Sequence, residues 1–285
     1  MSSTIFRDMR ISDTRIVPDR NIILHYDNCH FDNVTFVGDN IPDSIIFSEK
    51  CTLTNVTFTG INSIIMRRVQ NLYQIAFKDC KRLDLEGASG CRITIADSSS
   101  MTLIDVQDAN LSSLVCRDIS VDRIYLIRAT LLEANFLNVD FKKDFLLPQL
   151  LTKSRFENIT ARDWEGTYSD SLVKSTSFIN ISVSGRTVFH DKTISSYKTI
   201  SSYNVFEHCV FSNLELNQVK IGNAKFNDCS FKLVNFKEVL DSENVNAKGT
   251  PFAVLTASGP LLETLKKDNL QESLTRASLL LKGTP

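Results

Sequence analysis

Apolar residues recur at every fifth position through the middle of the chain. A helical period of 3.6 would spread such positions around the helix, and the period of two of a strand would place alternate ones on opposite faces. The pattern instead predicts a chain that turns a corner after each short extended segment, with an apolar side chain pointing inward on every side. Between residues 89 and 143 these central positions are Cys91, Ala96, Met101, Val106, Leu111, Cys116, Val121, Leu126, Leu131, Phe136 and Phe141.

The same period returns between residues 204 and 238, and shorter echoes lie outside both tracts. The residue two places before each central one is usually small or aliphatic. Phenylalanine is abundant, with 18 residues against one tryptophan, and we expect its flat rings to stack in an internal column. The central positions of the second tract are Phe206, Phe211, Leu216, Ile221, Phe226, Phe231 and Phe236.

Individual units resemble those of the pentapeptide-repeat family, in which a small residue is followed by Asp or Asn and then by Leu or Phe. The segments 134–138 (ANFLN) and 109–113 (ANLSS) match closely, and the resemblance covers roughly residues 29–240. The resemblance implies an all-β solenoid, a right-handed quadrilateral parallel β-helix. The second position departs from Asp or Asn in many units, which marks a divergent member, as at Thr35, Thr57, Tyr125, Lys225 and Ser230.

The composition predicts three segments. Residues 1–20 are expected to form an N-terminal segment or cap, residues 21–240 the β-helix with loop interruptions, and residues 241–285 a linker followed by C-terminal helices. An apolar stripe on the last helix must be buried, against the end of the solenoid, against a second chain or against a further domain. Because some members of the family dimerise through C-terminal elements, a homodimer is one of these alternatives. The stripe consists of Leu270, Leu274, Ala277 and Leu281.

No residue pattern indicates catalysis, a cofactor or a metal. The seven cysteines contain no Cys-x-x-Cys pair, and most fall at inward positions, so we expect free thiols that pack in the core. The four histidines show no metal-ligand spacing, and there is no glycine-rich phosphate loop. The sequence therefore predicts a protein that is not an enzyme, without a cofactor.

The charges are balanced, with a formal net charge of −1. Acidic side chains such as Asp105, Asp108, Asp118 and Asp122 alternate with Arg117 and Arg123, as on an ordinary polar surface. Some members of the family protect DNA gyrase as acidic imitations of duplex DNA, but a near-neutral rod fits that role poorly. Neutrality also argues against direct nucleic-acid binding. Gyrase protection is kept as the first alternative function, and a carbohydrate-active enzyme with paired acids as the second.

The period is interrupted in three places, and interruptions are where we expect a partner to bind, because solenoids accept insertions at their corners. The apolar segment 144–151 contains Phe145, Leu147 and Leu150, and it either folds back on the coil or offers a contact. The segment 161–171 carries Trp164 and Tyr168, either as an exposed aromatic loop or packed on a coil face. The third is a perfect duplication, KTISSY at 192–197 and again at 198–203, which we interpret as an extruded polar loop and not as a site.

The sequence thus favours a bacterial protein-interaction scaffold. No apolar run reaches the roughly 18 residues that span a bilayer, and residues 1–20 lack the features of a secretory signal. We expect a cytoplasmic protein, or an effector that reaches a host cell without a cleaved signal peptide. Secreted effectors with HECT-like ubiquitin ligase activity resemble this arrangement, and the chain would correspond to their recognition module alone.

Overall fold

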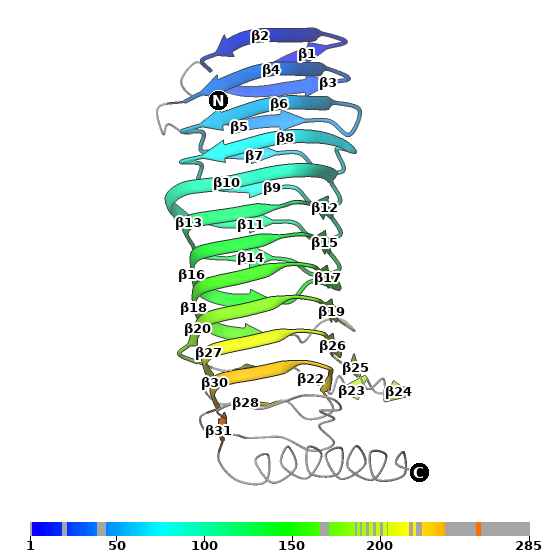
Figure 1. Ribbon diagram of the computed structural model, residues 1–285. Helices are drawn as coiled ribbons and strands as arrows, with labels where there is room; N and C mark the ends of the chain where they lie inside the picture. Colours follow the sequence, from blue (N-terminus) through cyan, green and yellow to red (C-terminus); the bar gives the residue numbers. More distant parts are fainter. Residues whose placement is uncertain are drawn as a thin grey trace, which may run out of the picture.

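The protein is a rod of stacked coils whose strands run across the rod axis (Figure 1). Equivalent residues on neighbouring coils pair in parallel about twenty positions apart, as Cys116 does with Phe136 and Phe136 with Phe156. The chain is therefore an all-β parallel solenoid. The computed structural model describes residues 2–18, 22–38, 44–165, 171–185, 187–188, 190–191, 194–195, 198–199, 202–203, 205–216, 219–220, 224–236 and 255–257.

Each full coil has four sides, which we name faces A to D in chain order. Face A begins with short strands that pair in sequence: β1 (Ser2–Arg7), β3 (Ile22–Asp27), β5 (Ser44–Phe47), β7 (Ser63–Ile65), β9 (Arg82–Asp84), β11 (Leu103–Asp105) and β14 (Ile124–Tyr125). It continues with the ends of two long strands and then with β21 (Thr187–Val188) and β28 (Val219–Lys220).

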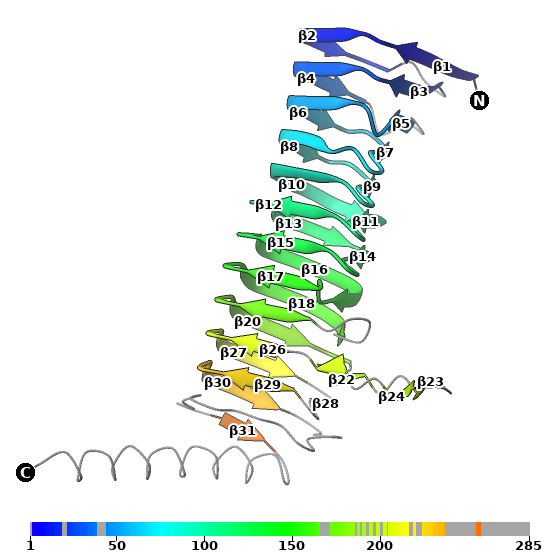
Figure 2. The same cartoon turned by 90° about the vertical axis from the view of Figure 1, so that its right-hand side faces the viewer.

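Face B follows face A around one corner. In the first coils single strands cross faces B and C together: β2 (Arg10–Ile16), β4 (His30–Val37), β6 (Thr52–Thr59) and β8 (Asn71–Lys78). Farther along, face B has its own short strands, which pair in order (Figure 2): β12 (Asn110–Ser112), β15 (Thr130–Leu132), β17 (Leu150–Thr152), β19 (Leu172–Lys174), β26 (Val205–Glu207) and β29 (Lys225–Asn227).

Longer strands build faces C and D in the later coils, and two of them run on into face A. These strands are β10 (Ser89–Met101), which begins on face B, β13 (Val115–Val121), β16 (Asn135–Leu146), β18 (Arg155–Glu165), β20 (Ser177–Val183), β27 (Val210–Leu216), β30 (Ser230–Phe236) and β31 (Leu255–Ala257). β16 and β18 are the two that reach face A, where Phe145 pairs with Trp164.

The central positions of the repeat point into the rod, as the sequence predicts. Leu111, Leu126, Phe136, Phe211 and Phe226 are all at most 2% exposed. On face C, phenylalanine rings stack from coil to coil with centroid separations of 4.6, 5.2, 5.2 and 4.7 Å. The column runs through Phe136, Phe156, Phe178, Phe211 and Phe231. The expected ring column is confirmed, and dispersion and apolar burial along it stabilise the coils against one another.

Left-handed residues make the corners. They commonly lie two positions after a central residue, as Asn138 follows Phe136, and Asn or Asp is the residue type that best tolerates this conformation. At the corner between faces C and D their side chains form a ladder in which each amide donates to the residue one coil earlier, over 2.7 to 2.9 Å. The ladder runs from Asn213 through Asn180, Asn158 and Asn138 to Asp118.

At the start of the central tract the inward positions lie one residue earlier than predicted. Ile95 pairs with Phe77 and Cys116 and is fully buried, whereas Cys91 is half-exposed. Gly90, which directly precedes Cys91, holds the inward position. A Cβ atom there would lie 2.6 Å from the Cβ of Leu72. Only glycine fits there, so a count of apolar residues passes over the position. A β-bulge between Ser98 and Met101 restores the phase.

The boundaries of the solenoid also differ from the expectation. β1 and β2 pair with β3 and β4, so the expected N-terminal segment 1–20 contains the first coil. Leu255 in β31 pairs with Val234, so solenoid pairing is found after residue 240 as well. The predicted C-terminal helices with Leu270, Leu274, Ala277 and Leu281 lie outside the described residues. Within the described part there is no helix, and hence none long and apolar enough to cross a membrane.

Candidate protein-interaction surface

The corner between faces A and B changes character along the rod. In the earlier coils single left-handed residues close it, namely Arg68, Gly87, Asp108 and Arg128, with φ between 56° and 67°. In the later coils two longer connections occupy it: residues 166–171 between β18 and β19, and residues 189–204 between β21 and β26. Residues 147–149 between β16 and β17 are as short as the connections of the earlier coils. Two of the three interruptions seen in the sequence therefore lengthen one corner, in consecutive coils, whereas the segment 144–151 lies in a coil of regular length.

The longest connection contains an antiparallel ribbon. Ser177 pairs with Val210 across a coil of 33 residues, whereas Val210 pairs with Ser230 across 20. The extra residues form β22 (His190–Asp191), β23 (Ile194–Ser195), β24 (Lys198–Thr199) and β25 (Ser202–Tyr203), with β22 paired to β25 and β23 to β24. Figure 2 shows β22, β23 and β24 extending sideways from the rod. The duplication is extruded as expected, but as a paired ribbon instead of a loop.

The apolar segment 144–151 is largely part of the core. Phe145 and Leu147 are 2% and 3% exposed, and the ring of Phe145 stacks on Phe141 with centroids 4.8 Å apart. Folding back on the coil, one of the two alternatives for this segment, is what the structure shows for these two side chains. They offer no surface to a partner, whereas Leu150 on face B is half-exposed.

Trp164 likewise packs inside the rod. It is fully buried, and its ring centroid lies 5.3 Å from Phe178 and 5.8 Å from Phe145. The interpretation of Trp164 as an exposed interface aromatic is therefore wrong, because β18 carries it into face A as a core residue. Tyr168 lies outside the described residues.

An apolar column on the outer side of face B was not anticipated. Leu150, Leu172 and Val205 pair with one another on consecutive coils, and all three are half-exposed. Leu132 lies one coil earlier on the same face and is 40% exposed. We name these four residues the face B patch. Leu172 and Val205 come directly after the two long corner connections.

Polar groups surround the face B patch. Lys174 Nζ lies 3.0 Å from Glu207 Oε2, which joins the two coils beside Leu172 and Val205. Thr130 precedes Leu150 in the same column, and Lys225 follows Val205. An apolar centre with a polar border is the usual composition of a protein-binding surface.

Elsewhere on the rod, acids are paired with bases on neighbouring coils. Arg128 donates from two nitrogens to the carboxylate of Asp108, at 2.6 Å each, and this holds the pKa of Asp108 below its usual range. Lys142 faces Asp122 at 3.9 Å and Lys78 faces Asp97 at 3.2 Å. Because each of these acids is paired with a base, these side chains do not form a continuous negative stripe.

Two buried carboxylates lie side by side on face A. Asp84 is fully buried, accepts a hydrogen bond from Arg67 Nε at 2.9 Å and forms an ion pair with Arg67 Nη2 at 2.7 Å. Asp105 pairs with it on the next coil, is 8% exposed and accepts the backbone N–H of Gln107 at 3.1 Å. Burial, and then the charges of Asp84 and Glu86, raise the pKa of Asp105. Both carboxylates are shielded from a polysaccharide.

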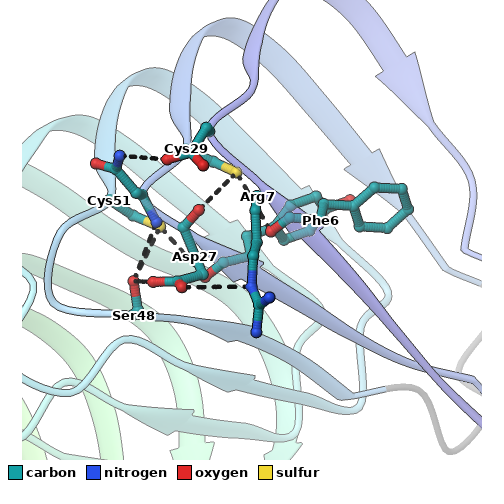
Figure 3. A network of polar contacts seen from close by, with 9 residues as sticks. Phe6, Arg7, Asp27, Cys29, Ser48 and Cys51 are labelled. Carbon is teal, nitrogen blue, oxygen red and sulfur yellow. Dashed lines mark hydrogen bonds and ion pairs between the residues drawn. The ribbon is translucent and has the colours of Figure 1, made fainter.

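The cysteines behave as core residues, with one exception. All seven are free thiols, and six are buried, whereas Cys91 is half-exposed because of the phase shift at Gly90. Figure 3 shows Cys29 and Cys51, whose thiols donate to carbonyl oxygens of Asp27 and Tyr26, each at 3.4 Å. Burial raises the pKa of the Cys80 thiol to about 12 and also raises that of Cys116. No group of three His, Cys, Asp or Glu side chains within the described residues could hold a metal.

The comparisons with known proteins add only weak similarities. No family model and no curated protein matches the chain. One similar structure is HetL, a pentapeptide repeat protein involved in heterocyst differentiation regulation from the cyanobacterium Nostoc, with a TM-score of 0.22 and 11% identity over 69% of this chain and 85% of that one. Another is QnrB1, a plasmid-mediated fluoroquinolone resistance protein, with a TM-score of 0.32 and 12% identity over 93% of this chain and 96% of that one.

Such low scores carry no argument about function, so the class of protein follows from the chain itself. Its repeating five-residue sides, four-faced coils and left-handed corners define an all-β parallel solenoid whose repeat resembles that of pentapeptide-repeat proteins.

Proposed function

We propose that the protein is a non-enzymatic scaffold that binds a protein partner on the face B patch and the adjoining corner. The observation that carries this proposal is the outward apolar column of Leu150, Leu172 and Val205, directly beside the two long corner connections. The side chains in question are held on paired strands, so they form a rigid surface that a partner meets without ordering cost.

The same surface indicates the chemistry of the partner. The ion pair between Lys174 and Glu207 neutralises the two charges beside Leu172 and Val205, so this part of the border does not favour a strongly charged partner. An apolar or aromatic segment of a protein fits the column of aliphatic side chains. Exposed apolar side chains of this kind, framed by polar groups, are typical of protein contacts.

The two alternative functions receive less support from the described residues. A gyrase-protecting imitation of DNA would need roughly one negative charge per 1.7 Å, whereas Asp108, Asp122 and Asp97 each face a base. A glycan-cleaving enzyme would need accessible paired acids, whereas Asp84 and Asp105 are buried. The bacterial origin, the effector role, the cytoplasmic location and dimerisation through the C-terminal helices stay predictions from the sequence.

Variants of the face B patch test the proposal. The tagged full chain is used to isolate a partner, which is then purified, and its affinity is measured by calorimetry for the original chain and for Leu172→Lys. Asn110→Lys is the matched control, because Asn110 lies in the same outward column three coils earlier and is exposed. We expect Leu172→Lys to weaken binding at least tenfold and Asn110→Lys to leave it unchanged.

Two other results would contradict the proposal. If both variants bind the partner as the original chain does, the face B patch is not the binding surface. If the protein instead protects gyrase-dependent DNA supercoiling from a quinolone, the DNA-imitating alternative replaces the scaffold.

A further inference from the structure

Two cysteines lie on neighbouring coils at the corner between faces B and C. Cys209 follows β26 and Cys229 follows β29, and the residues on either side of them are paired in parallel. The backbone N–H of Ser230 donates to the carbonyl oxygen of Cys209 over 2.8 Å. Neighbouring strands lie about 4.8 Å apart, which is within the Cα separation of about 4.4 to 6.8 Å found in disulfides. We name Cys209 and Cys229 the thiol pair.

The thiol pair continues a buried column of small side chains along this corner. Ser154 and Thr176 hold the equivalent position on the two preceding coils, and all four side chains are buried. Each of them donates to the carbonyl oxygen two residues earlier, over 3.0 Å for the two hydroxyls and over 3.4 and 3.5 Å for the thiols of Cys209 and Cys229. A hydroxyl thus makes the same contact as a thiol, and packing alone does not require sulfur at this position.

The two thiols also interact with each other. When Cys209 is ionised, the thiol of Cys229 donates a hydrogen bond to it, which lowers the pKa of Cys209 although burial opposes this. The same contact raises the pKa of Cys229, so the pair loses one proton much more easily than two. Burial instead raises the pKa of Cys80 and of Cys116. A thiolate beside a thiol is the arrangement from which a disulfide forms.

A second stacked pair of cysteines provides a comparison within the same chain. Cys29 and Cys51 lie on neighbouring coils at the corner between faces A and B (Figure 3), where the N–H of Thr52 donates to the carbonyl oxygen of Cys29 over 3.0 Å. There the sulfur of Cys51 lies 3.8 Å from Ser48 Oγ. Burial is the main cause that raises the pKa of Cys29. Cys29 is therefore disfavoured as a thiolate, in contrast to Cys209.

We propose that the thiol pair is a site of reversible oxidation, which a small oxidant of the peroxide class converts to a disulfide between two coils. The thiolate of Cys209 attacks one oxygen of hydrogen peroxide, the O–O bond breaks and hydroxide leaves, so that Cys209 becomes a sulfenic acid. The sulfur of Cys229 then attacks that of Cys209, and the S–S bond forms as the S–O bond breaks. Overall the two thiols lose two electrons and two protons, and the peroxide is reduced to two molecules of water.

The surroundings of the thiol pair restrict the reaction. Both side chains are only 1% exposed, so the oxidant has to be small. In a reducing compartment a disulfide of this kind is transient, as redox-sensing disulfides are. The inference does not depend on the face B patch, which can bind a partner in either redox state.

The first experiment detects the disulfide in the full chain with the variant Cys91→Ser, which removes the half-exposed thiol. The folded chain is treated with hydrogen peroxide, the excess is removed with catalase, and the chain is unfolded in iodoacetamide and digested for mass spectrometry. We expect a peptide pair linked through Cys209 and Cys229 that a dithiol reductant separates, and a melting temperature that oxidation raises by about 5 °C. A pair that stays reduced overturns the proposal. So does a lower melting temperature, because the bond would then distort the coils.

Two further variants assign the order of the steps. Because serine already occupies the column at Ser154, we expect Cys209→Ser and Cys229→Ser to keep the fold. Each is oxidised and then unfolded in dimedone, which labels sulfenic acids. Cys229→Ser should carry the label on Cys209, whereas Cys209→Ser should carry none on Cys229. The reverse result, or no label on Cys209, would refute Cys209 as the attacking thiol.

The pair of Cys29 and Cys51 is the matched control. The variant Cys29→Ser/Cys51→Ser, made in the Cys91→Ser chain, should form the disulfide of the thiol pair as readily as before. If Cys29 and Cys51 become linked as readily as the thiol pair, contact between neighbouring coils decides alone, and the assignment to Cys209 and Cys229 is wrong.

Discussion

The corner between faces A and B is built in two ways along the same rod. In the earlier coils one left-handed residue per coil closes it, and Arg128 binds Asp108 on the coil before. In the later coils the connections grow until one of them holds the whole ribbon. The neighbouring sides keep the same packing in both parts of the rod. Phe178 still stacks on Phe211 across the 33-residue coil, with ring planes 9° apart.

This contrast shows where the stability of the solenoid lies. The sides form the core and the strand pairing. Corners also contribute some coil-to-coil hydrogen bonds, such as the asparagine ladder, but their length can change while the sides stay paired. Lengthening a connection adds a loop-closure cost that grows slowly with length, about 0.6 kcal/mol for a doubling. Corners are therefore the place where this fold can acquire new surfaces.

The largest effect is expected from a change in a side. Phe156→Ala removes a fully buried ring between Phe136 and Phe178, and it should lower the free energy of unfolding by about 3 to 5 kcal/mol. Leu172→Ala, on the outer side of face B, is the control and should cost less than about 1 kcal/mol. Urea unfolding followed by circular dichroism measures both. Equal losses would contradict the distinction between inner and outer columns.

A change in the tight half of the corner should have an intermediate effect. Gly87 has φ +67°, and an added Cβ would lie 3.2 Å from Arg68 Cγ. Gly87→Ala forces an alanine into the left-handed region and should cost about 1 to 2 kcal/mol. Gly87→Asn should cost less, because asparagine tolerates this conformation. Thermal unfolding measures the loss of stability in the two variants. An identical loss would mean that steric contact of the added side chain, and not the left-handed backbone conformation, excludes other residues from this corner.

A smaller, pH-dependent effect is expected at Asp105 on face A. The pKa of Asp105 is raised in the folded state, so folding favours the protonated carboxyl. The free energy of unfolding therefore falls as the pH rises from below the unfolded pKa through the folded pKa. Asp105→Asn stays neutral and can still accept the N–H of Gln107. The variant should therefore be more stable than the original chain at pH 7, with a smaller difference at pH 3. Urea unfolding at the two pH values measures this, and a difference that is independent of pH would refute it.

The smallest effect should follow from removing the ribbon. Deletion of residues 191–203 shortens the 33-residue coil to 20 and leaves the paired sides in place. The unfolding free energy of the isolated chain should change by less than about 0.6 kcal/mol. Denaturation at low protein concentration, where association is negligible, provides the measurement. A large loss would show that the ribbon is an integral part of the solenoid.

The sequence predicts the sides of this protein better than its surfaces. Residues such as Phe136 and Phe211 are found from the period because each side must bury an apolar side chain. Gly90 escapes the same reasoning, because its inward position is defined by the close approach of Leu72 and not by hydrophobicity. Trp164 could be placed only once β18 was seen to continue into face A.

The face B patch could not be predicted from the sequence, for another reason. Leu150, Leu172 and Val205 are 22 and 33 residues apart, and they become neighbours only when the lengths of the irregular coils are known. The same lengths bring two of the three interruptions to one corner. A periodic sequence determines which residues point inward, but contacts between outer residues depend on connections whose length follows no period.

The phase shift at Gly90 has a practical consequence for spectroscopy. Since Cys91 is half-exposed and the six other thiols are buried, the native chain should react once with a maleimide, and mass spectrometry would verify the single adduct. A fluorophore or nitroxide attached there would mark a known coil of an otherwise unaltered rod. Distances from that fixed point to a labelled binding partner could then locate the partner along the axis.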